Sequence, residues 1–123
     1  MLKEPLVSVV MPAYKHKYID QALDSLFAQT YSNIEVIICD DSTDDKIKNL
    51  IEDKYQNSRF KINYSKNEKR LWGFGSVERG VGLASGEYIK ILHDDDILLP
   101  TCVSELVYAT VEGKAILEKT GRK

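Results

Sequence analysis

Short apolar runs alternate with segments of helical periodicity along almost the whole sequence. The runs cover residues 6–11, 34–39, 60–64 and 88–92, and short runs of this kind are typical of buried strands. Between them, apolar residues recur at the spacing that places them on one face of a helix. Strands that alternate with helices predict an α/β fold in three layers, with a mainly parallel sheet covered by helices on both faces.

The apolar stripes predict four helices, one after each strand, over about 18–28, 47–55, 77–84 and 100–111. The polar and then glycine-rich stretch 65–75 is predicted to be a loop.

Three glycines, two inside and one after it, are expected to affect the third helix. Gly80 and Gly82 are expected to allow close backbone packing, because neither carries a side chain. The pair Ser85–Gly86 stands where helices commonly end on a glycine.

Size and charge exclude several classes of protein. The 123 residues fit one domain, 1–123, and the formal net charge of −2 argues against a nucleic-acid binder. The two cysteines show neither metal-binding spacing nor a disulfide framework. No apolar stretch is long enough to span a bilayer. We expect a cytoplasmic protein, and attachment to the inner face of a membrane stays open.

Acidic residues directly follow two of the predicted strands. Asp40–Asp41 come after 34–39, and Asp94–Asp96 come after 88–92. Ligands bind at the carboxyl edge of open α/β sheets, where both clusters are expected to lie. Adjacent carboxylates repel, and oxygen ligands of this kind favour Mg²⁺ or Mn²⁺. The simpler interpretation is that the first cluster caps the second helix and the second forms a turn that caps the fourth.

Five segments of the sequence belong together as a pattern. They are Val7–Tyr14, Ala22–Glu35, Asp40–Asp41, Leu83–Ile89 and Asp94–Pro100. In this order and at this spacing they resemble family 2 glycosyltransferases of the GT-A fold. The resemblance covers nearly the whole chain. It implies a Rossmann-like sheet with strand order 3-2-1-4 and a ligand crevice between the first and fourth strands.

The resemblance also implies a site for a nucleotide-sugar donor. Pro12, Ala13 and Tyr14 correspond to the segment whose tyrosine packs on the base. Asp41 corresponds to the residue that hydrogen-bonds the base, which is usually uracil. Asp95 corresponds to the ligand of a divalent cation, Mn²⁺ or Mg²⁺, that bridges the donor diphosphate.

Several positions depart from the family pattern. His93 stands where many members carry aspartate, so the cation is expected on Asp95 with help from Asp94 or Asp96. His93 and Asp94 are further candidates for substrate contact. Glu78 stands where many members carry asparagine, and is a candidate for a sugar or phosphate contact.

The basic and aromatic residues of the predicted loop leave alternatives open. Arg70 is suited to the donor diphosphate, and a solvated loop residue is the alternative. Trp72 either covers the sugar site as part of a mobile flap or anchors the loop.

The expected reaction is transfer of a sugar from a UDP-sugar, with inversion, to an unknown glycan, lipid or protein. Family enzymes are substantially longer, and their second half carries the carboxylate that deprotonates the acceptor. We therefore expect a fragment or donor-binding half that is inactive in isolation.

Two other functions remain open at this stage. A receiver-type signalling domain would share the α/β order and an acidic pocket, and a non-catalytic nucleotide-binding module would act with another subunit. Whichever holds, the bare edge of strand 88–92 predicts self-association.

Overall fold

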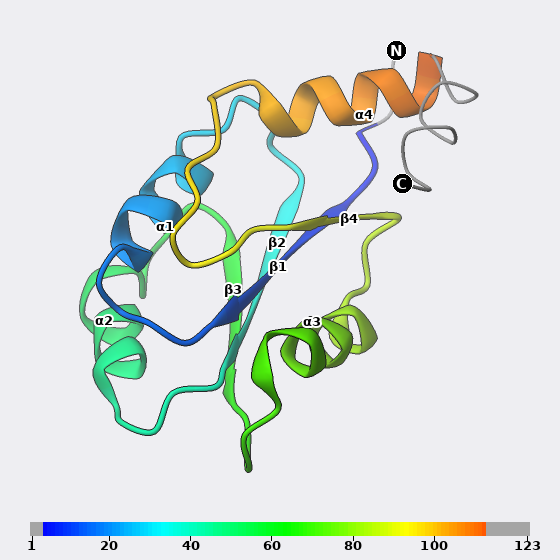
Figure 1. The fold of residues 1–123 in the computed structure, drawn as a ribbon. Coiled ribbons are helices and arrows are strands. Elements are labelled where there is room, and N and C mark those ends of the chain that lie inside the picture. Colours follow the sequence, from blue (N-terminus) through cyan, green and yellow to red (C-terminus); the bar gives the residue numbers. More distant parts are fainter. Residues whose placement is uncertain (1–3, 113–123) are drawn as a thin grey trace.

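The computed structural model describes residues 4–112 and contains one parallel sheet (Figure 1). Its strands are β1 (Val7–Ala13), β2 (Ile34–Asp40), β3 (Lys61–Lys66) and β4 (Tyr88–Ile91). They are hydrogen-bonded in the order β3-β2-β1-β4, and every neighbouring pair is parallel. The predicted fold class and strand order are confirmed.

Within residues 4–112, four helices connect and follow the strands. They are α1 (Ile19–Phe27), α2 (Lys46–Lys54), α3 (Trp72–Leu83) and α4 (Cys102–Glu112). The third helix begins at Trp72, inside the stretch that was predicted to be a loop. That prediction was wrong because the N–H groups of Leu71 and Trp72, at the start of α3, bond to the carboxylate of Asp41, which follows β2 and is a partner that local sequence does not reveal.

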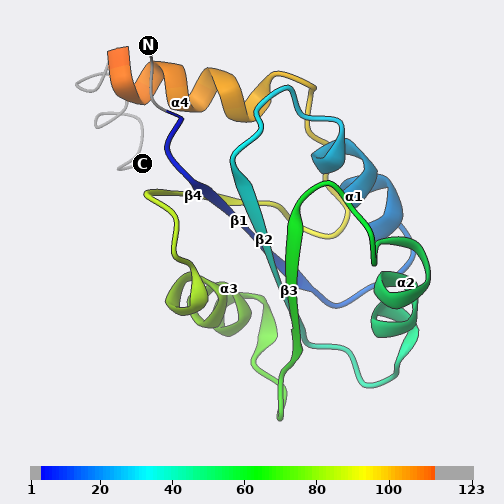
Figure 2. The same ribbon diagram turned by 180° about the vertical axis from the view of Figure 1, so that it is seen from behind.

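Alternating strand residues build two apolar layers on the two faces of the sheet. Val9 and Met11 of β1 belong to the larger cluster, which includes residues of α1, α2 and α4. Val10 points to the other face, with Ile37 and Cys39. Figures 1 and 2 show α3 on the opposite side of the sheet from α1 and α2. No helix in the described range 4–112 is long and apolar enough to cross a membrane.

Close packing of α3 depends on one of its two candidate glycines. A Cβ atom at Gly80 would lie 2.3 Å from Cγ1 of Val10, so a larger residue would push α3 off the sheet. At Gly82 a Cβ atom would meet nothing within 4 Å. The prediction of close packing is therefore right for Gly80 and wrong for Gly82.

A polar junction joins the amino ends of β1, β2 and β4. The Glu35 carboxylate accepts hydrogen bonds from the Ser8 hydroxyl and from the backbone N–H of Ser85, the latter at 2.8 Å. The Gly86 N–H donates to Oγ of Ser8 at 2.8 Å. The prediction that Gly86 ends a helix was wrong. The C-cap of α3 is the extended residue Ala84, and no glycine in the described part of the chain has a positive φ.

Replacing Glu35 by glutamine is expected to cost about 1–2 kcal/mol of unfolding free energy near neutral pH. Burial raises the pKa of Glu35, but hydrogen bonds from Ser8 and Ser85 outweigh it and hold the pKa below its usual 4.5. The ionised group thus stabilises the fold above pH 4.5, and this contribution is lost as the pH falls through the lower pKa of the folded state. In acid, the free energy of unfolding of Glu35→Gln, measured with urea, should approach that of wild type. The exposed Glu52→Gln serves as control, and a pH-independent difference would contradict the assignment.

The outer edge of β4 has no strand partner among residues 4–112, because β4 pairs only with β1. Ile89 on this strand is half-exposed. Self-association through this edge stays a prediction, and a clean monomer in light scattering at high concentration would contradict it.

Candidate functional site

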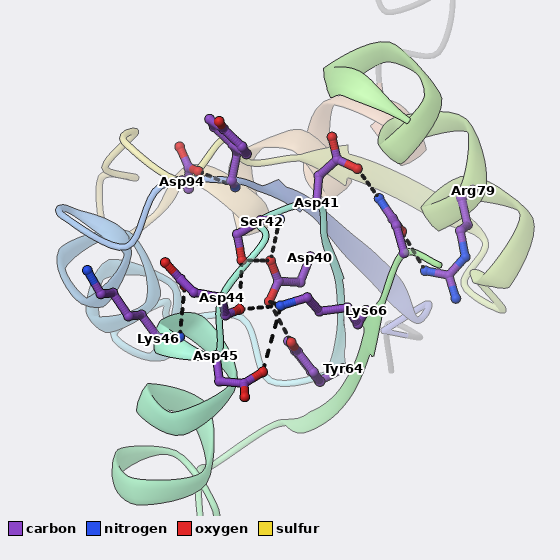
Figure 3. Close-up of polar contacts among 12 residues, drawn as sticks. Asp40, Asp41, Ser42, Asp44, Asp45, Lys46, Tyr64, Lys66, Arg79 and Asp94 are labelled. Atoms are coloured by element: carbon purple, nitrogen blue, oxygen red, sulfur yellow. Dashed lines mark hydrogen bonds and ion pairs between the residues drawn. The ribbon is translucent and has the colours of Figure 1, made fainter. Parts of the chain in front are cut away.

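The loops that follow β1, β2 and β4 meet at the carboxyl edge of the sheet. The backbone N–H of Asp41, just after β2, donates to the Ala13 carbonyl at 2.7 Å. The Asp94 carboxylate, after β4, accepts from the backbone N–H groups of Tyr14 and Lys15 at 2.7 and 2.8 Å. Tyr14, Asp41 and Asp94 therefore lie on one edge, and Figure 3 shows the two aspartates there.

The Asp41 carboxylate is buried and accepts four hydrogen bonds. Oδ1 accepts from Nδ2 of Asn67 and from the backbone N–H of Leu71, both at 2.8 Å. Oδ2 accepts from Nε of Arg70 at 2.6 Å and from the backbone N–H of Trp72 at 2.8 Å. We call this arrangement the Asp41 clamp. It supplies the N-terminal capping of α3, a helix that is distant from Asp41 in sequence.

The clamp keeps Asp41 ionised. Burial raises the pKa of this carboxyl group, but hydrogen bonds from Leu71, Asn67, Arg70 and Trp72 outweigh burial and hold the pKa below its usual 3.8. At neutral pH the group is therefore a pure hydrogen-bond acceptor at the edge of the sheet.

Asn67 is a residue of the site that sequence reasoning missed. It follows β3 directly, and its backbone N–H donates to the Asp40 carbonyl at 2.9 Å. Its amide donates to Oγ of Ser76 at 2.9 Å and accepts from Nη1 of Arg79 at 3.0 Å. These bonds fix the amide that holds Asp41. The available signal was its position, because a polar residue just after a strand lies at the ligand edge.

Arg70 lies between two aromatic rings. Its guanidinium carbon is 4.0 Å from the ring centroid of Tyr14 and 3.8 Å from that of Trp72. Planar guanidinium groups stack well on aromatic faces. Arg70 thus contacts both residues that the resemblance assigns to the base, Tyr14 and Asp41. It is not a free loop residue.

Trp72 has an unusual backbone conformation, with φ 65°. A bulky residue in the left-handed region pays about 1–2 kcal/mol. The N–H bond to Asp41 and the stack on Arg70 hold it in place. Its side chain is 63% exposed. This backbone conformation therefore places an aromatic ring at the surface beside the clamp.

Asp40, the other member of the pair, serves a different purpose. Its fully buried carboxylate accepts from the Tyr64 hydroxyl and from the backbone N–H and hydroxyl of Ser42. Lys66 lies 3.9 Å from Oδ2. Figure 3 shows Asp40 enclosed by these groups, with Asp41 pointing elsewhere. Burial and the bond to Asp40 raise the pKa of Tyr64, which keeps its hydroxyl protonated as the donor.

The simpler capping interpretation of both acidic clusters was wrong. The N-cap of α2 is Asp45, so neither residue of the Asp40–Asp41 pair caps that helix. In α4, the N–H of Val103 is bonded to Oε1 of Gln29 instead of to an acidic residue. The acidic triplet does form a turn, closed by a 3.1 Å bond from the Asp96 N–H to the His93 carbonyl.

The three acidic residues of this turn do not converge. The Asp94 carboxylate is hydrogen-bonded to the loop after β1, whereas the side chains of Asp95, Asp96 and His93 are exposed. Within residues 4–112, no three His, Cys, Asp or Glu side chains are grouped so as to hold a metal ion. The residues therefore do not form an all-protein cage. They do fit the mode in which Mg²⁺ is held by one or two carboxylates and the phosphates of its substrate.

Three other candidates take different positions. Pro12 and Ala13 are buried in β1, where the Ala13 carbonyl supports Asp41. Glu78 is exposed on α3. Ligand contacts of these three residues stay predictions.

Two open grooves flank the Asp41 clamp. One has a volume of about 580 Å³ and is lined by Asp41–Thr43 and Lys66–Arg70. The other has a volume of about 280 Å³ and is lined by Tyr14–Lys17 and Ser42–Asp44. Ser42 and Thr43 line both grooves, whereas Asp41, Asn67 and Arg70 line only the larger one.

Relatives in sequence carry glycosyltransferase names. A Campylobacter jejuni protein named GalNAc(5)-diNAcBac-PP-undecaprenol beta-1,3-glucosyltransferase is 31% identical over 125 residues, which are 95% of this chain and 40% of that protein. Escherichia coli WfaP, named UDP-Glc:alpha-D-GlcNAc-diphosphoundecaprenol beta-1,3-glucosyltransferase, is 36% identical over 107 residues, 84% of this chain and 40% of that protein. The chain thus spans well under half the length of these relatives.

Solved structures share the fold. S. aureus TarS in complex with UDP superposes with a TM-score of 0.76 at 28% identity, over 87% of this chain and 32% of that one. The mannosyltransferase PcManGT from Pyrobaculum calidifontis, in complex with GDP-Man and Mn²⁺, superposes with a TM-score of 0.69 at 22% identity, over 77% of this chain and 29% of that one. The second likeness shows the fold alone.

The alternative of a receiver-type domain is wrong. Receiver domains have the strand order 2-1-3-4-5, whereas β1 here lies between β2 and β4. Residues 8–118 match the family described as Glycosyl transferase family 2, which is most of the chain. The chain therefore belongs to glycosyl transferase family 2.

Proposed function

We propose that this chain binds the nucleotide-sugar donor, a UDP-sugar, of an inverting and metal-dependent glycosyltransferase. The observation that carries the proposal is the meeting of Tyr14 and the ionised Asp41 at the crevice where the strand order reverses. The similarity to TarS, which was solved with UDP and with UDP-GlcNAc, supports a uridine nucleotide.

Each of the two residues recognises a different feature of the base. The half-exposed Tyr14 ring offers a face on which a base stacks. Asp41, which only accepts hydrogen bonds, favours uracil, because uracil presents a ring N–H. Cytosine presents an acceptor at the same ring position, and the carboxylate would repel it.

Asp95, with Asp96 as neighbour, is the proposed protein ligand of the cation. Both carboxylates are exposed at the crevice edge, on a turn that Asp94 anchors to the loop after β1. A bound Mn²⁺ or Mg²⁺ would neutralise the charge of the departing diphosphate. Asp94 positions this turn and so places Asp95 relative to Tyr14.

Transfer also needs an acceptor hydroxyl that attacks the anomeric carbon from the face opposite the diphosphate. The C–O bond to the diphosphate breaks as the new C–O bond forms, and a carboxylate takes the hydroxyl proton. In the family enzymes that this chain resembles, that carboxylate lies in the second half of the protein. We propose a glycan, a lipid or a protein as acceptor.

Calorimetry with UDP tests this proposal directly. We expect wild type to bind UDP, and Mn²⁺ to tighten binding by about tenfold, a typical coupling between two ligands. Asp95→Asn should keep the metal-free affinity and lose most of the gain from Mn²⁺. Asp53→Asn, an exposed charge-matched control on α2, should behave as wild type. No heat with UDP, with or without Mn²⁺, would refute the donor site.

A further inference from the structure

We propose that Arg70 is a built-in competitor of the base: it covers one ring face of Tyr14 and bonds to the carboxylate of Asp41, and a base reaches both together only by displacing it. This inference rests on the proposed function. It adds a mechanism by which the site regulates its own occupancy.

Arg70 reproduces both interactions expected of uracil. Its guanidinium is a flat group, 4.0 Å from the Tyr14 ring centroid, which is a stacking distance. Its Nε–H donates to Oδ2 of Asp41 at 2.6 Å, as a ring N–H of uracil would. One side chain thus satisfies the aromatic face and the acceptor together.

The face of Tyr14 that Arg70 covers admits only one flat group at a time. The guanidinium already lies against the Tyr14 ring, and the Trp72 ring lies against the same guanidinium, with its centroid 3.8 Å from the guanidinium carbon. Inserting a base between Tyr14 and Arg70 would require a separation of about 7 Å, close to twice the observed one. The stack must therefore open before a base can lie on this face of Tyr14.

The rest of the Asp41 clamp survives this exchange. When Arg70 leaves, Oδ1 keeps its bonds from Asn67 and Leu71, and Oδ2 keeps its bond from Trp72. The N–H of the base replaces that of Arg70, so the buried carboxylate stays satisfied. The displaced side chain of Arg70 has open space beside it, because Arg70 also lines the 580 Å³ groove.

The competition gives the site a means of selection. A base that stacks but cannot donate to Asp41 replaces only one of the two contacts that Arg70 loses. Such a base would leave Oδ2 of Asp41 with one hydrogen-bond donor fewer. Arg70 would therefore displace this base from the site. Uracil replaces both contacts, so Arg70 is expected to sharpen discrimination against cytosine.

Trp72 makes the exchange directly measurable. It is the only tryptophan of the sequence, and it touches Arg70. Its intrinsic fluorescence therefore reports on this stack. Uridine is the better probe for affinity, because it lacks phosphates and the loss of a positive charge does not weaken it by long-range electrostatics.

The experiment compares wild type with Arg70→Ala, Arg70→Lys and the control Lys48→Ala. Lys48 is exposed on α2 and forms no ion pair within residues 4–112. We expect Arg70→Ala to bind uridine about tenfold more tightly than wild type, because the competing conformation is removed. Arg70→Lys, which keeps the charge without the flat group, should lie between them, and Lys48→Ala should match wild type.

The outcomes separate the two proposals. Uridine binding by wild type that is unchanged or weaker in Arg70→Ala would overturn the competitor role and leave the donor site intact. Absence of uridine and UDP binding in every variant would overturn both. Without any ligand, Arg70→Ala must also change the emission of Trp72. An unchanged spectrum would show that the stack does not exist in solution, and would overturn the competitor role whatever the affinities are.

Discussion

Replacing Asp41 by asparagine is expected to lower the free energy of unfolding by about 3 kcal/mol and to weaken UDP binding about a hundredfold. Asparagine has the same shape as aspartate but offers only one acceptor oxygen. Its NH₂ group would face two N–H donors, those of Arg70 and Trp72 or those of Asn67 and Leu71. The buried donors on that side would lose their partner, and Arg70 would lose its counter-charge.

Urea unfolding and calorimetry measure the two effects separately. Asp53→Asn makes the same chemical change on the exposed face of α2 and should leave both quantities within about 0.5 kcal/mol of wild type. If Asp41→Asn were as stable as the control, the clamp would not exist in solution. If it were destabilised and still bound UDP normally, Asp41 would have a structural role without base recognition.

Replacing Gly86 by alanine is expected to cost about 3 kcal/mol, at the upper end of what overpacking usually costs. A Cβ atom there would lie 2.7 Å from the Ser8 backbone N and 2.8 Å from the Leu6 carbonyl O. Both are main-chain atoms at the start of β1, and the Leu6 carbonyl also accepts the N–H of Glu87. Neither can move without breaking the pairing of β1 with β4.

Gly82→Ala is the matched control for this change. Nothing lies within 4 Å of a Cβ atom at Gly82, which is inside α3. Alanine favours helices over glycine, so this variant should be as stable as wild type or more stable by up to about 1 kcal/mol. Thermal or urea unfolding of the two variants side by side tests the packing. Equal stability of Gly86→Ala and wild type would show that β4 is not docked as described.

The architecture was predictable because it depends on burial patterns that are local in sequence. Val9, Val10 and Met11 form a run that is apolar at every position, which is the pattern of a strand covered on both faces. The acidic residues that follow β2 and β4 could be placed on one edge, since parallel strands end on the same side. Asp41 and Asp94 are found there.

The partners of those residues were not predictable in this way. Gly73 and Gly75 made the start of α3 resemble a loop, because glycine has low helix propensity. The helix begins at Trp72 because a distant carboxylate accepts its first N–H groups. The need for glycine at position 86 was likewise misassigned, since the cause is contact with β1.

By itself the sequence determined the order of strands and helices along the chain and which edge of the sheet carries the acidic residues. Both follow from periodic burial and from strand direction, which operate over a few residues. Only the tertiary structure decided that Arg70 lies between Tyr14 and Trp72 and that Asp41 holds α3. The physical reason is that hydrogen bonds and ring stacks between distant segments depend on strand order and register, which bring together residues that no local pattern connects.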